Sequence, residues 1–176
     1  MKNKMMIAML AIGSTLATTH AFAAAGTVNF NGNILDSACD VDVASQNQVV
    51  VLGDYYKTEF PTTGARTAAT QFNIVLKNCP VTVTSAKVRF DGTPDATNAS
   101  LLAIDSSAAG AATGVAINLM TADKADLPLH GSNSYSYVLS STADNTLSFY
   151  AQYISTAATV TAGPANSVAN FSVIYN

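Results

Sequence analysis

The alternation of apolar and polar residues is clearest in the last nine positions of the chain. One face of an extended strand over 168–176 would carry four apolar or aromatic side chains, those of Ala169, Phe171, Val173 and Tyr175. The opposite face would carry Asn170 and Ser172, and only Ile174 departs from the period of two that is typical of a strand. Because the chain stops at Asn176, we expect no later segment to return and pair with the far edge of this strand.

A second segment with clean alternation lies near the other end of the chain, over 26–34. Val28, Phe30 and Ile34 would point to one side, and Gly32 stands where the series calls for another apolar residue. A glycine at such a position permits the close approach of another backbone. The opposite side would be uniformly polar, with Asn29, Asn31 and Asn33. The pattern predicts a strand, but it leaves open whether that strand pairs within its own chain or with another molecule.

Between these two segments, apolar runs recur about every ten residues with turn residues between them. We predict a turn leading into a short strand over 35–43, and strands over 48–53, 70–79, 81–90, 114–120, 127–129, 135–139 and 146–154. A short apolar run lies over 101–104, and the stretch 159–163 leads to the terminal strand. The strand over 70–79 would carry Phe72, Ile74 and Leu76 on one face, and Asp91-Gly92 is expected to form a turn. No amphipathic helix of normal length is present, and the Ala/Ser/Gly-rich stretch over 106–113 is expected to be a loop. The spacing predicts an all-β fold in one domain, an immunoglobulin-like Greek-key β-sandwich.

Residues 1–23 have the features of an export signal. Two lysines precede an apolar run over 5–17 that is too short to span a bilayer, and Ala-Phe-Ala at 21–23 gives the small-x-small pattern of a cleavage site. We therefore exclude this signal peptide from the fold and expect the mature chain to begin at Ala24.

Charge is sparse along the chain. Eight Lys and Arg against 11 Asp and Glu give a net charge of −3, and two of the basic residues leave with the signal peptide. No basic cluster remains, so nucleic acid and anionic membrane are poor partners for this surface, and we expect neither. No remaining apolar run is long enough for a membrane-spanning helix, so we expect a secreted, soluble product without membrane insertion.

The chain has two cysteines, Cys39 and Cys79. Exported proteins meet oxidising conditions, so these residues predict one disulfide closing a loop of about forty residues, worth roughly 3–4 kcal/mol. The alternative is a cysteine-containing metal site, which needs more ligands than this chain offers. We therefore predict a disulfide and no metal.

Candidate catalytic and metal-binding residues are few. His130 is the one histidine after the signal peptide, and neither a catalytic triad nor a zinc site can be built around it alone. Asp40 and Asp42 follow the first cysteine closely, but two carboxylates are too few for a calcium site of six to eight oxygens. The sequence therefore predicts neither an enzyme nor a cofactor.

Two tyrosine pairs offer a different kind of site. Tyr55 with Tyr56, and Tyr135 with Tyr137, could stack on a sugar, although packing in the core and at its rim is the simpler interpretation. Asn98 and Asn170 match the acceptor pattern for N-glycosylation, and in a chain this rich in Asn, Ser and Thr both matches are attributed to chance.

Taken together, these features resemble the pilins of the chaperone–usher pathway, close to the type 1 fimbrial subunits. The resemblance covers essentially the whole mature chain. It rests on the segment 26–34 before the first cysteine, on Cys39 with Cys79, and on the strand text over 114–120. The ending adds to it, with Gly163 fourteenth from the end and Tyr175 penultimate.

The resemblance implies a fold and a mode of assembly. Pilins resemble an immunoglobulin domain that lacks its seventh strand, so that the last strand lines an open apolar groove. The residues implied for this groove and for chaperone binding are Gly163, Ala169, Phe171, Val173, Tyr175 and Asn176. A periplasmic chaperone lends a strand to the groove and grips the terminal carboxylate, here that of Asn176.

The resemblance also assigns a role to the N-terminal segment. At the outer-membrane usher, the extension of the next subunit replaces the chaperone strand, which builds a head-to-tail polymer. This implies a donor-strand extension over 24–36, with Gly26, Val28, Phe30, Gly32 and Ile34 as its key residues, followed by a pilin domain over 37–176.

We therefore predict a structural fimbrial subunit that is exported through the periplasm, polymerises by donor-strand exchange and supports cell adhesion. Its expected partners are a periplasmic chaperone, the usher and neighbouring subunits. The alternative hypothesis is a free-standing secreted β-sandwich that binds a ligand such as a sugar.

Overall fold

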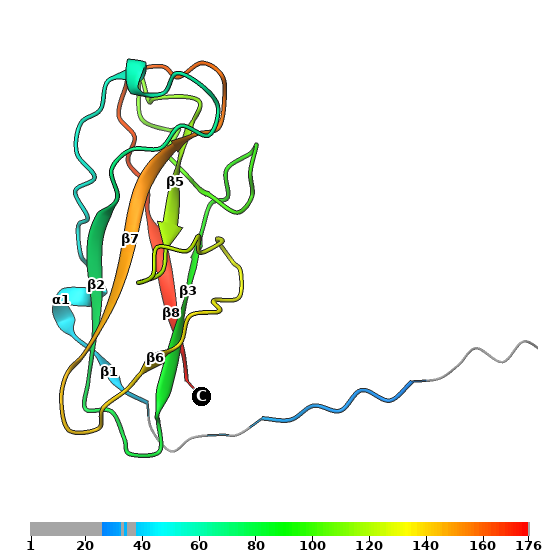
Figure 1. Ribbon diagram of the computed structural model, residues 1–176, viewed down its shortest axis with the longest axis vertical. Coiled ribbons are helices and arrows are strands. Elements are labelled where there is room, and N and C mark those ends of the chain that lie inside the picture. The colour runs from blue at the N-terminus through cyan, green and yellow to red at the C-terminus, as the bar shows by residue number, and fades with distance from the viewer. Residues whose placement is uncertain (1–25, 33, 35–37, 176) are drawn as a thin grey trace, which may run out of the picture. The chain divides into compact units, whose positions relative to one another are not determined.

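A computed structural model of the chain describes residues 26–32, 34 and 38–175 (Figure 1). The predicted signal peptide and the mature N-terminus at Ala24 lie outside the described residues. The chain divides into two units, Met1–Ile34 and Leu35–Asn176, and the second contains the regular secondary structure. No helix among the described residues has both the length and the apolar character needed to cross a membrane.

The second unit is built almost entirely from strands, as predicted. Its elements in chain order are β1 (Asp40–Val41), α1 (Val43–Gln46), a 3-10 turn (Lys57–Glu59), β2 (Thr70–Lys77), β3 (Ser85–Gly92), β4 (Leu102–Ala103), β5 (Val115–Met120), β6 (Tyr137–Val138), β7 (Asn145–Ser155) and β8 (Ala169–Tyr175). The long strands β2, β3, β5, β7 and β8 run side by side along this unit (Figure 1).

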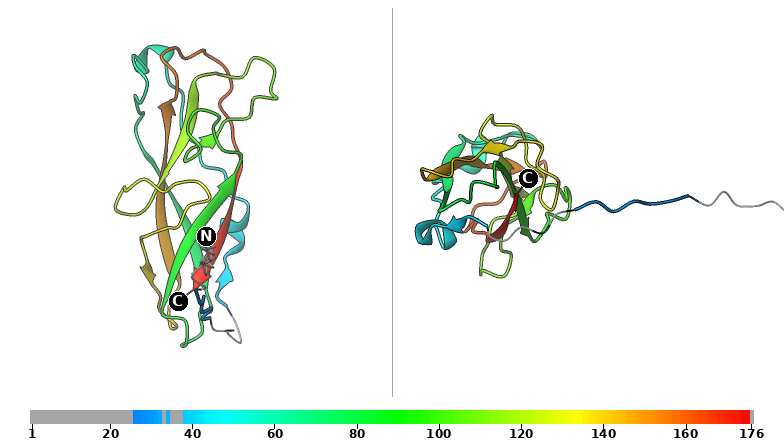
Figure 2. Two further views of the ribbon diagram at one scale, coloured as in Figure 1. Left: turned by 90° about the vertical axis from the view of Figure 1, so that its right-hand side faces the viewer. Right: turned by 90° about the horizontal axis from the view of Figure 1, so that it is seen from below.

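Within the described residues, the strands form two antiparallel sheets. One has five strands in the order β1-β2-β7-β5-β4, and the other has three in the order β6-β3-β8. Figure 2 shows β8 lying alongside β3, with the chain reversing direction between them. The strand order differs from the chain order, as expected of a Greek-key sandwich.

The core lies between the inner faces of the two sheets. Ile74 and Leu76 of β2, Val88 of β3 and Phe149 of β7 are completely buried. Phe90 meets Phe149 edge-on with 5.3 Å between ring centroids, a geometry favoured by the ring quadrupoles. The predicted inward face of β2 is confirmed, because alternate residues of this strand pack into one cluster.

Several predicted boundaries are wrong, and each has a local cause. The strand expected over 81–90 begins only at Ser85, because Val83 N–H donates to Pro80 C=O in a turn. It then continues through Asp91 and Gly92, where a turn was expected, because these residues pair with β8. The run over 127–129 is not a strand: Leu127 N–H bonds to Leu119, but the proline that follows has no N–H to continue a ladder.

One further predicted strand is absent from the described structure, because the run over 48–53 has no assigned strand. The stretch over 159–163, which leads to the terminal strand, makes an isolated bridge between Thr161 and Thr113. Both border the same open groove, described below, where strand partners are lacking. The single turn of helix in α1 was also missed, because four residues are too few to show a helical period.

Gly163 lies in the loop before β8 and packs tightly against another loop. A Cβ on this residue would collide with the carbonyl oxygen of Gly110 and lie 2.7 Å from the backbone nitrogen of Ala112. Gly163 also has a φ of +155°, which disfavours other residues. It therefore fixes the approach of the chain to the last strand.

We predict that Gly163→Ala lowers the free energy of unfolding by about 1–3 kcal/mol, because the added methyl group has no space. The measurement is urea unfolding of the monomeric chain. Gly32→Ala serves as the control, since nothing in the described structure lies within 4 Å of a Cβ at Gly32. Equal unfolding midpoints for Gly163→Ala and the control would contradict the packing described here.

Candidate functional site

The last strand, β8, is paired on one edge only. It pairs along its whole length with β3, from Ala169 opposite Gly92 to Tyr175 opposite Ala86. Among the described residues no strand pairs with its other edge. The backbone N–H and C=O groups on that edge are therefore available to a further strand.

The inner face of β8 is also incompletely covered. Its inward residues, Ala169, Phe171, Val173 and Tyr175, pack against the core but remain only partly buried. On the neighbouring strand β3, Ala86 and Val88 are 0% exposed. Two adjacent strands of one sheet thus differ sharply in how well their inner faces are buried. The difference indicates that the sandwich lacks cover on the β8 side.

The segment over 47–54 faces β8 across this gap. Val50 and Leu52 are partly buried, whereas Val49 and Val51 are exposed, so the segment has the alternation of a strand. No backbone–backbone hydrogen bond from its N–H or C=O groups is found within the described residues. The side chain of Gln48 anchors the segment by donating to the carbonyl of Asn73 at 3.0 Å. The segment is therefore a second edge without a strand partner.

Between these two edges runs a groove with a volume of about 930 Å³. One wall is the segment 45–55, and the other is the chain from Val160 to Phe171. The floor consists of core side chains, among them Phe72, Ile74, Phe90 and Leu119. A smaller hollow adjoins β8 near α1 and is lined by Val41, Gln46, Ala169, Asn170 and Phe171. The groove is thus an opening into the hydrophobic core.

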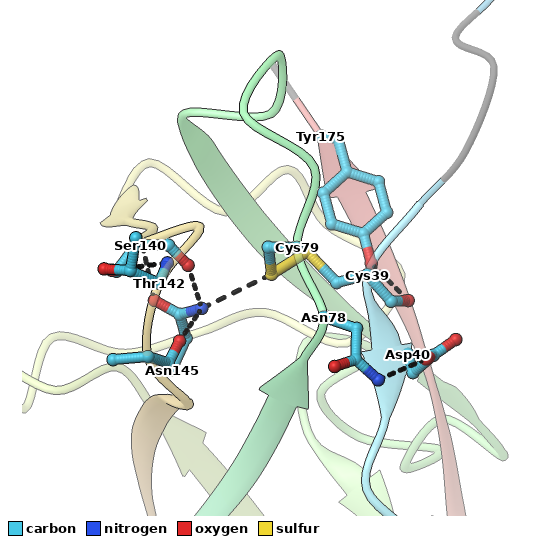
Figure 3. The surroundings of a disulfide bond; sticks show 9 residues. Cys39, Asp40, Asn78, Cys79, Ser140, Thr142, Asn145 and Tyr175 are labelled. Atoms are coloured by element: carbon cyan, nitrogen blue, oxygen red, sulfur yellow. Dashed lines mark hydrogen bonds between the residues drawn. A yellow bond between two sulfur atoms is a disulfide. The ribbon is translucent and has the colours of Figure 1, made fainter.

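A disulfide lies at the start of the chain segment that forms the 45–55 wall of the groove. Cys39 and Cys79 are bonded, as predicted (Figure 3). Cys39 directly precedes β1, and Cys79 lies two residues after the end of β2, so the bond joins these two strands at one end. Tyr175 O–H donates to the carbonyl of Cys39 at 3.3 Å, and burial raises the pKa of this phenol. The hydroxyl therefore stays protonated and ties the end of β8 to the disulfide.

Helix α1 fastens the same wall to β2. The Asp42 carboxylate accepts a hydrogen bond from Ala44 N–H at the helix start, and its hydrogen bond with Lys77 lowers the pKa of this carboxyl. Ser45 Oγ accepts from Val75 N–H at 2.9 Å. The Asp42 carboxylate is thus engaged by Ala44 and Lys77 within the fold. Within the described residues no cluster of three potential metal-ligating side chains exists.

The sequence-predicted site residues fall into two groups. Ala169, Phe171, Val173 and Tyr175 lie together on the inner face of β8, and Gly163 lines the groove from the preceding loop. Asn176 lies outside the described residues. The predicted donor residues Gly26, Val28, Phe30, Gly32 and Ile34 belong to the other unit, adopt no assigned strand and are exposed, Phe30 at 92%.

The remaining candidates have structural roles. His130 Nδ1 lies 2.8 Å from Asp91 Oδ1, and His130 Nε2 lies 2.9 Å from the carbonyl oxygen of Gly92. The hydrogen bond between His130 and Asp91 lowers the pKa of the Asp91 carboxyl. Asn98 accepts from Ser100 N–H in a turn, and Asn170 lies within β8.

The tyrosine pairs do not form an exposed aromatic platform. Tyr137 is buried and donates to the carbonyl of Ser148 at 2.6 Å, while Tyr135 packs against it with 4.7 Å between centroids. Tyr55 packs edge-on against Tyr153, which leaves Tyr56 exposed without its neighbour. This geometry does not favour the sugar-binding alternative.

Comparison with known proteins agrees with this architecture. The chain matches the family described as "Fimbrial protein" over residues 28–176. It is 38% identical to the type-1 fimbrial protein A chain of Escherichia coli K12 over 182 residues, which covers 99% of this chain and 100% of that protein. It is 40% identical to the fimbrial subunit type 1 of Klebsiella pneumoniae over 152 residues, covering 85% and 83% of the two chains.

Solved structures give the same result. A type I fimbria protein of Burkholderia pseudomallei has a TM-score of 0.60 at 38% identity, covering 80% of this chain and 91% of that one. A subunit of a chaperone–usher pilus has a TM-score of 0.66 at 26% identity, covering 93% and 100%. The P pilus rod subunit PapA has a TM-score of 0.67 at 23% identity, covering 80% and 100%, which shows the fold alone.

The half-covered sandwich with a groove beside its last strand is the immunoglobulin-like pilin fold that lacks a strand. The chain belongs to the fimbrial protein family and is a pilus subunit of the chaperone–usher type. Fimbrial subunits of this type are exported to the extracellular fimbria.

We predict that Cys79→Ser destabilises the monomer by roughly 3–4 kcal/mol, because the unfolded chain regains the entropy of the open loop. Urea unfolding under non-reducing conditions measures the loss. The matched controls are Cys39→Ser and the double variant, which should cost about the same as either single change because one bond is lost in each case. A double variant that loses twice as much would show that the two sulfurs act separately.

Proposed function

We propose that the groove accepts an extended strand from another subunit and that residues 24–36 supply such a strand to the groove of a neighbouring subunit. The observation that carries the proposal is a pair of edges, β8 and the segment 47–54, on either side of a groove that opens into the core. Among the residues that the structure describes, neither edge has a strand partner on the groove side. A single strand laid between them would satisfy both edges and cover the exposed apolar floor.

The N-terminal segment has the chemistry that such a groove requires. Val28, Phe30 and Ile34 are large apolar side chains that are exposed, an arrangement that costs free energy in water. Burying each is worth about 1.5–3 kcal/mol, and each ladder hydrogen bond adds about 0.5–1.5 kcal/mol net. Gly32 lets the donor backbone approach the acceptor closely at one inward position. The two surfaces are therefore complementary in polarity and periodicity.

The same groove accounts for the expected partners. Before assembly, a periplasmic chaperone would fill it with a strand of its own and bind the carboxylate of Asn176. At the outer-membrane usher, the extension of an incoming subunit would replace that strand. Because donor and acceptor lie on different parts of the chain, each addition leaves a new free end, and the product is an open head-to-tail fibre that supports adhesion of the cell.

We predict that Phe30→Asp abolishes polymerisation without unfolding the domain, because a carboxylate would be forced into an apolar groove. The matched control is Asn29→Asp, which adds the same charge one residue earlier, on the opposite face of the donor strand. Size-exclusion chromatography and electron microscopy of surface fibres report assembly, and circular dichroism reports the fold. Equal loss of fibres in both variants would point to charge alone rather than to burial of Phe30.

Deletion of residues 24–34 separates pairing between subunits from pairing within one chain. If the segment acts on another subunit, the shortened chain should be recovered with its chaperone and should bind a synthetic peptide, AAGTVNFNGNILD. The complex should resist heat and denaturant far better than the shortened chain alone, because the peptide binds only the folded state. Release of the chaperone on adding peptide is followed by native gel electrophoresis. If the shortened chain cannot be recovered even with its chaperone, pairing between subunits is disproved.

A further inference from the structure

Asn31 and Gly32 form the one Asn-Gly pair in the sequence, and they lie in the middle of the proposed donor strand. In such a pair the backbone nitrogen of the glycine can attack the side-chain amide carbon of the asparagine. Ammonia leaves and a five-membered succinimide forms. Water then opens the ring at either carbonyl, giving aspartate or isoaspartate, with no oxidant or reductant required. Glycine favours this reaction because it has no Cβ to obstruct the attacking nitrogen.

The structure leaves this pair open to the reaction. Asn31 and Gly32 are both exposed and lie in no assigned strand. Nothing in the described structure lies within 4 Å of the place where a Cβ on Gly32 would be. No hydrogen bond of either residue is found within the part of the chain that the structure describes. The backbone can therefore turn to bring the glycine nitrogen to the amide carbon.

Another residue followed by glycine shows what protection looks like in this fold. Asp91 precedes Gly92 and is open in principle to the same ring closure. Both residues are held in the ladder between β3 and β8, and the Asp91 carboxylate is engaged by Arg89 and His130. A Cβ on Gly92 would lie 3.2 Å from the carbonyl oxygen of Val168, so the backbone there has little room to rotate. Strand pairing and packing thus block the reaction.

We propose that Asn31 is a site of spontaneous deamidation in the unassembled subunit and that its conversion to isoaspartate disables the N-terminal segment as a donor strand. The second half of this proposal rests on the proposed function. Isoaspartate routes the main chain through the former side chain and adds a methylene to the backbone. Phe30 and Ile34, on either side of it, then no longer share one face, because a strand keeps its faces only at a strict period of two.

Assembly should prevent the same reaction. Once residues 26–34 are paired on both edges in a neighbouring subunit, the extended backbone holds the glycine nitrogen away from the amide carbon. The reaction then requires the donor strand to open locally. A subunit that is incorporated promptly is preserved, whereas one that waits loses its ability to join the fibre.

The test compares the monomeric mature chain from the periplasm with assembled fibres, both incubated in the same mildly alkaline buffer. Peptide mapping by mass spectrometry follows the replacement of NH₂ by OH, and electron-transfer fragmentation distinguishes isoaspartate from aspartate. Asn29, followed by the bulky Phe30, is an internal control in the same exposed segment. Asn31→Gln is the matched variant, because its longer side chain forms the ring far more slowly.

We expect Asn31 to convert in the monomer while Asn29 and Asp91 stay intact, and to convert at least about a hundredfold more slowly in fibres, where local opening must come first. The polymerisation yield of aged monomer should fall in proportion to its isoaspartate content. Aged Asn31→Gln should keep the yield of its own fresh sample. Treatment with isoaspartyl methyltransferase and S-adenosylmethionine, which returns isoaspartate to aspartate, should restore polymerisation of the aged chain.

Conversion of Asn31 no faster than that of Asn29, or equally fast in fibres and monomer, would overturn the proposal. So would aged monomer that polymerises as well as fresh monomer despite containing isoaspartate. If fresh monomer fails to polymerise at all, the proposed function fails and the donor-strand half of this proposal fails with it. The mass spectra still decide the deamidation half on their own.

Discussion

The hydrophobic core of this sandwich is closed on one side and open on the other, and the rest of the molecule follows from that imbalance. The inner face of β3 is buried at Ala86, Val88 and Phe90. β8, which is hydrogen-bonded to β3, leaves Phe171 and its inward neighbours only partly buried. Apolar surface in contact with water is a standing driving force for association. The fold therefore fixes the geometry of the groove but leaves the apolar side chains at its floor without a covering strand among the described residues.

The opening is held in shape rather than left to collapse. The disulfide, the Tyr175 hydrogen bond and the bond from Val75 N–H to Ser45 fix one wall and the end of β8 at a set separation. A groove whose walls are already ordered loses little conformational entropy when a strand enters it. Under the proposed function, the entropy of ordering would then fall mainly on the donor segment, whose described residues 26–32 and 34 are exposed and lie in no assigned strand.

Sequence patterns predicted the parts of this arrangement that depend on local periodicity. The alternation in β8 and β2 was visible because each has one face toward the core, and the cysteines were predicted to pair from the oxidising compartment alone. The wall over 48–53 was predicted as a strand because it is an apolar run closed by Gly53. Among the described residues it lacks a strand partner, which no local pattern reveals. The packing of Gly163 on Gly110 was equally invisible, because it joins loops far apart in the chain.

The position of the disulfide has a mechanical consequence. If residues 24–36 link each subunit to its neighbour as proposed, tension on a fibre would enter the subunit through this segment and reach Cys39 before the rest of the domain. From there the sulfur–sulfur bond would carry it directly to Cys79, since residues 40–78 form a loop closed by that bond. The loop closed by the disulfide contains α1, β2 and the segment 45–55, which is one wall of the groove. Such a load would bypass this wall of the groove.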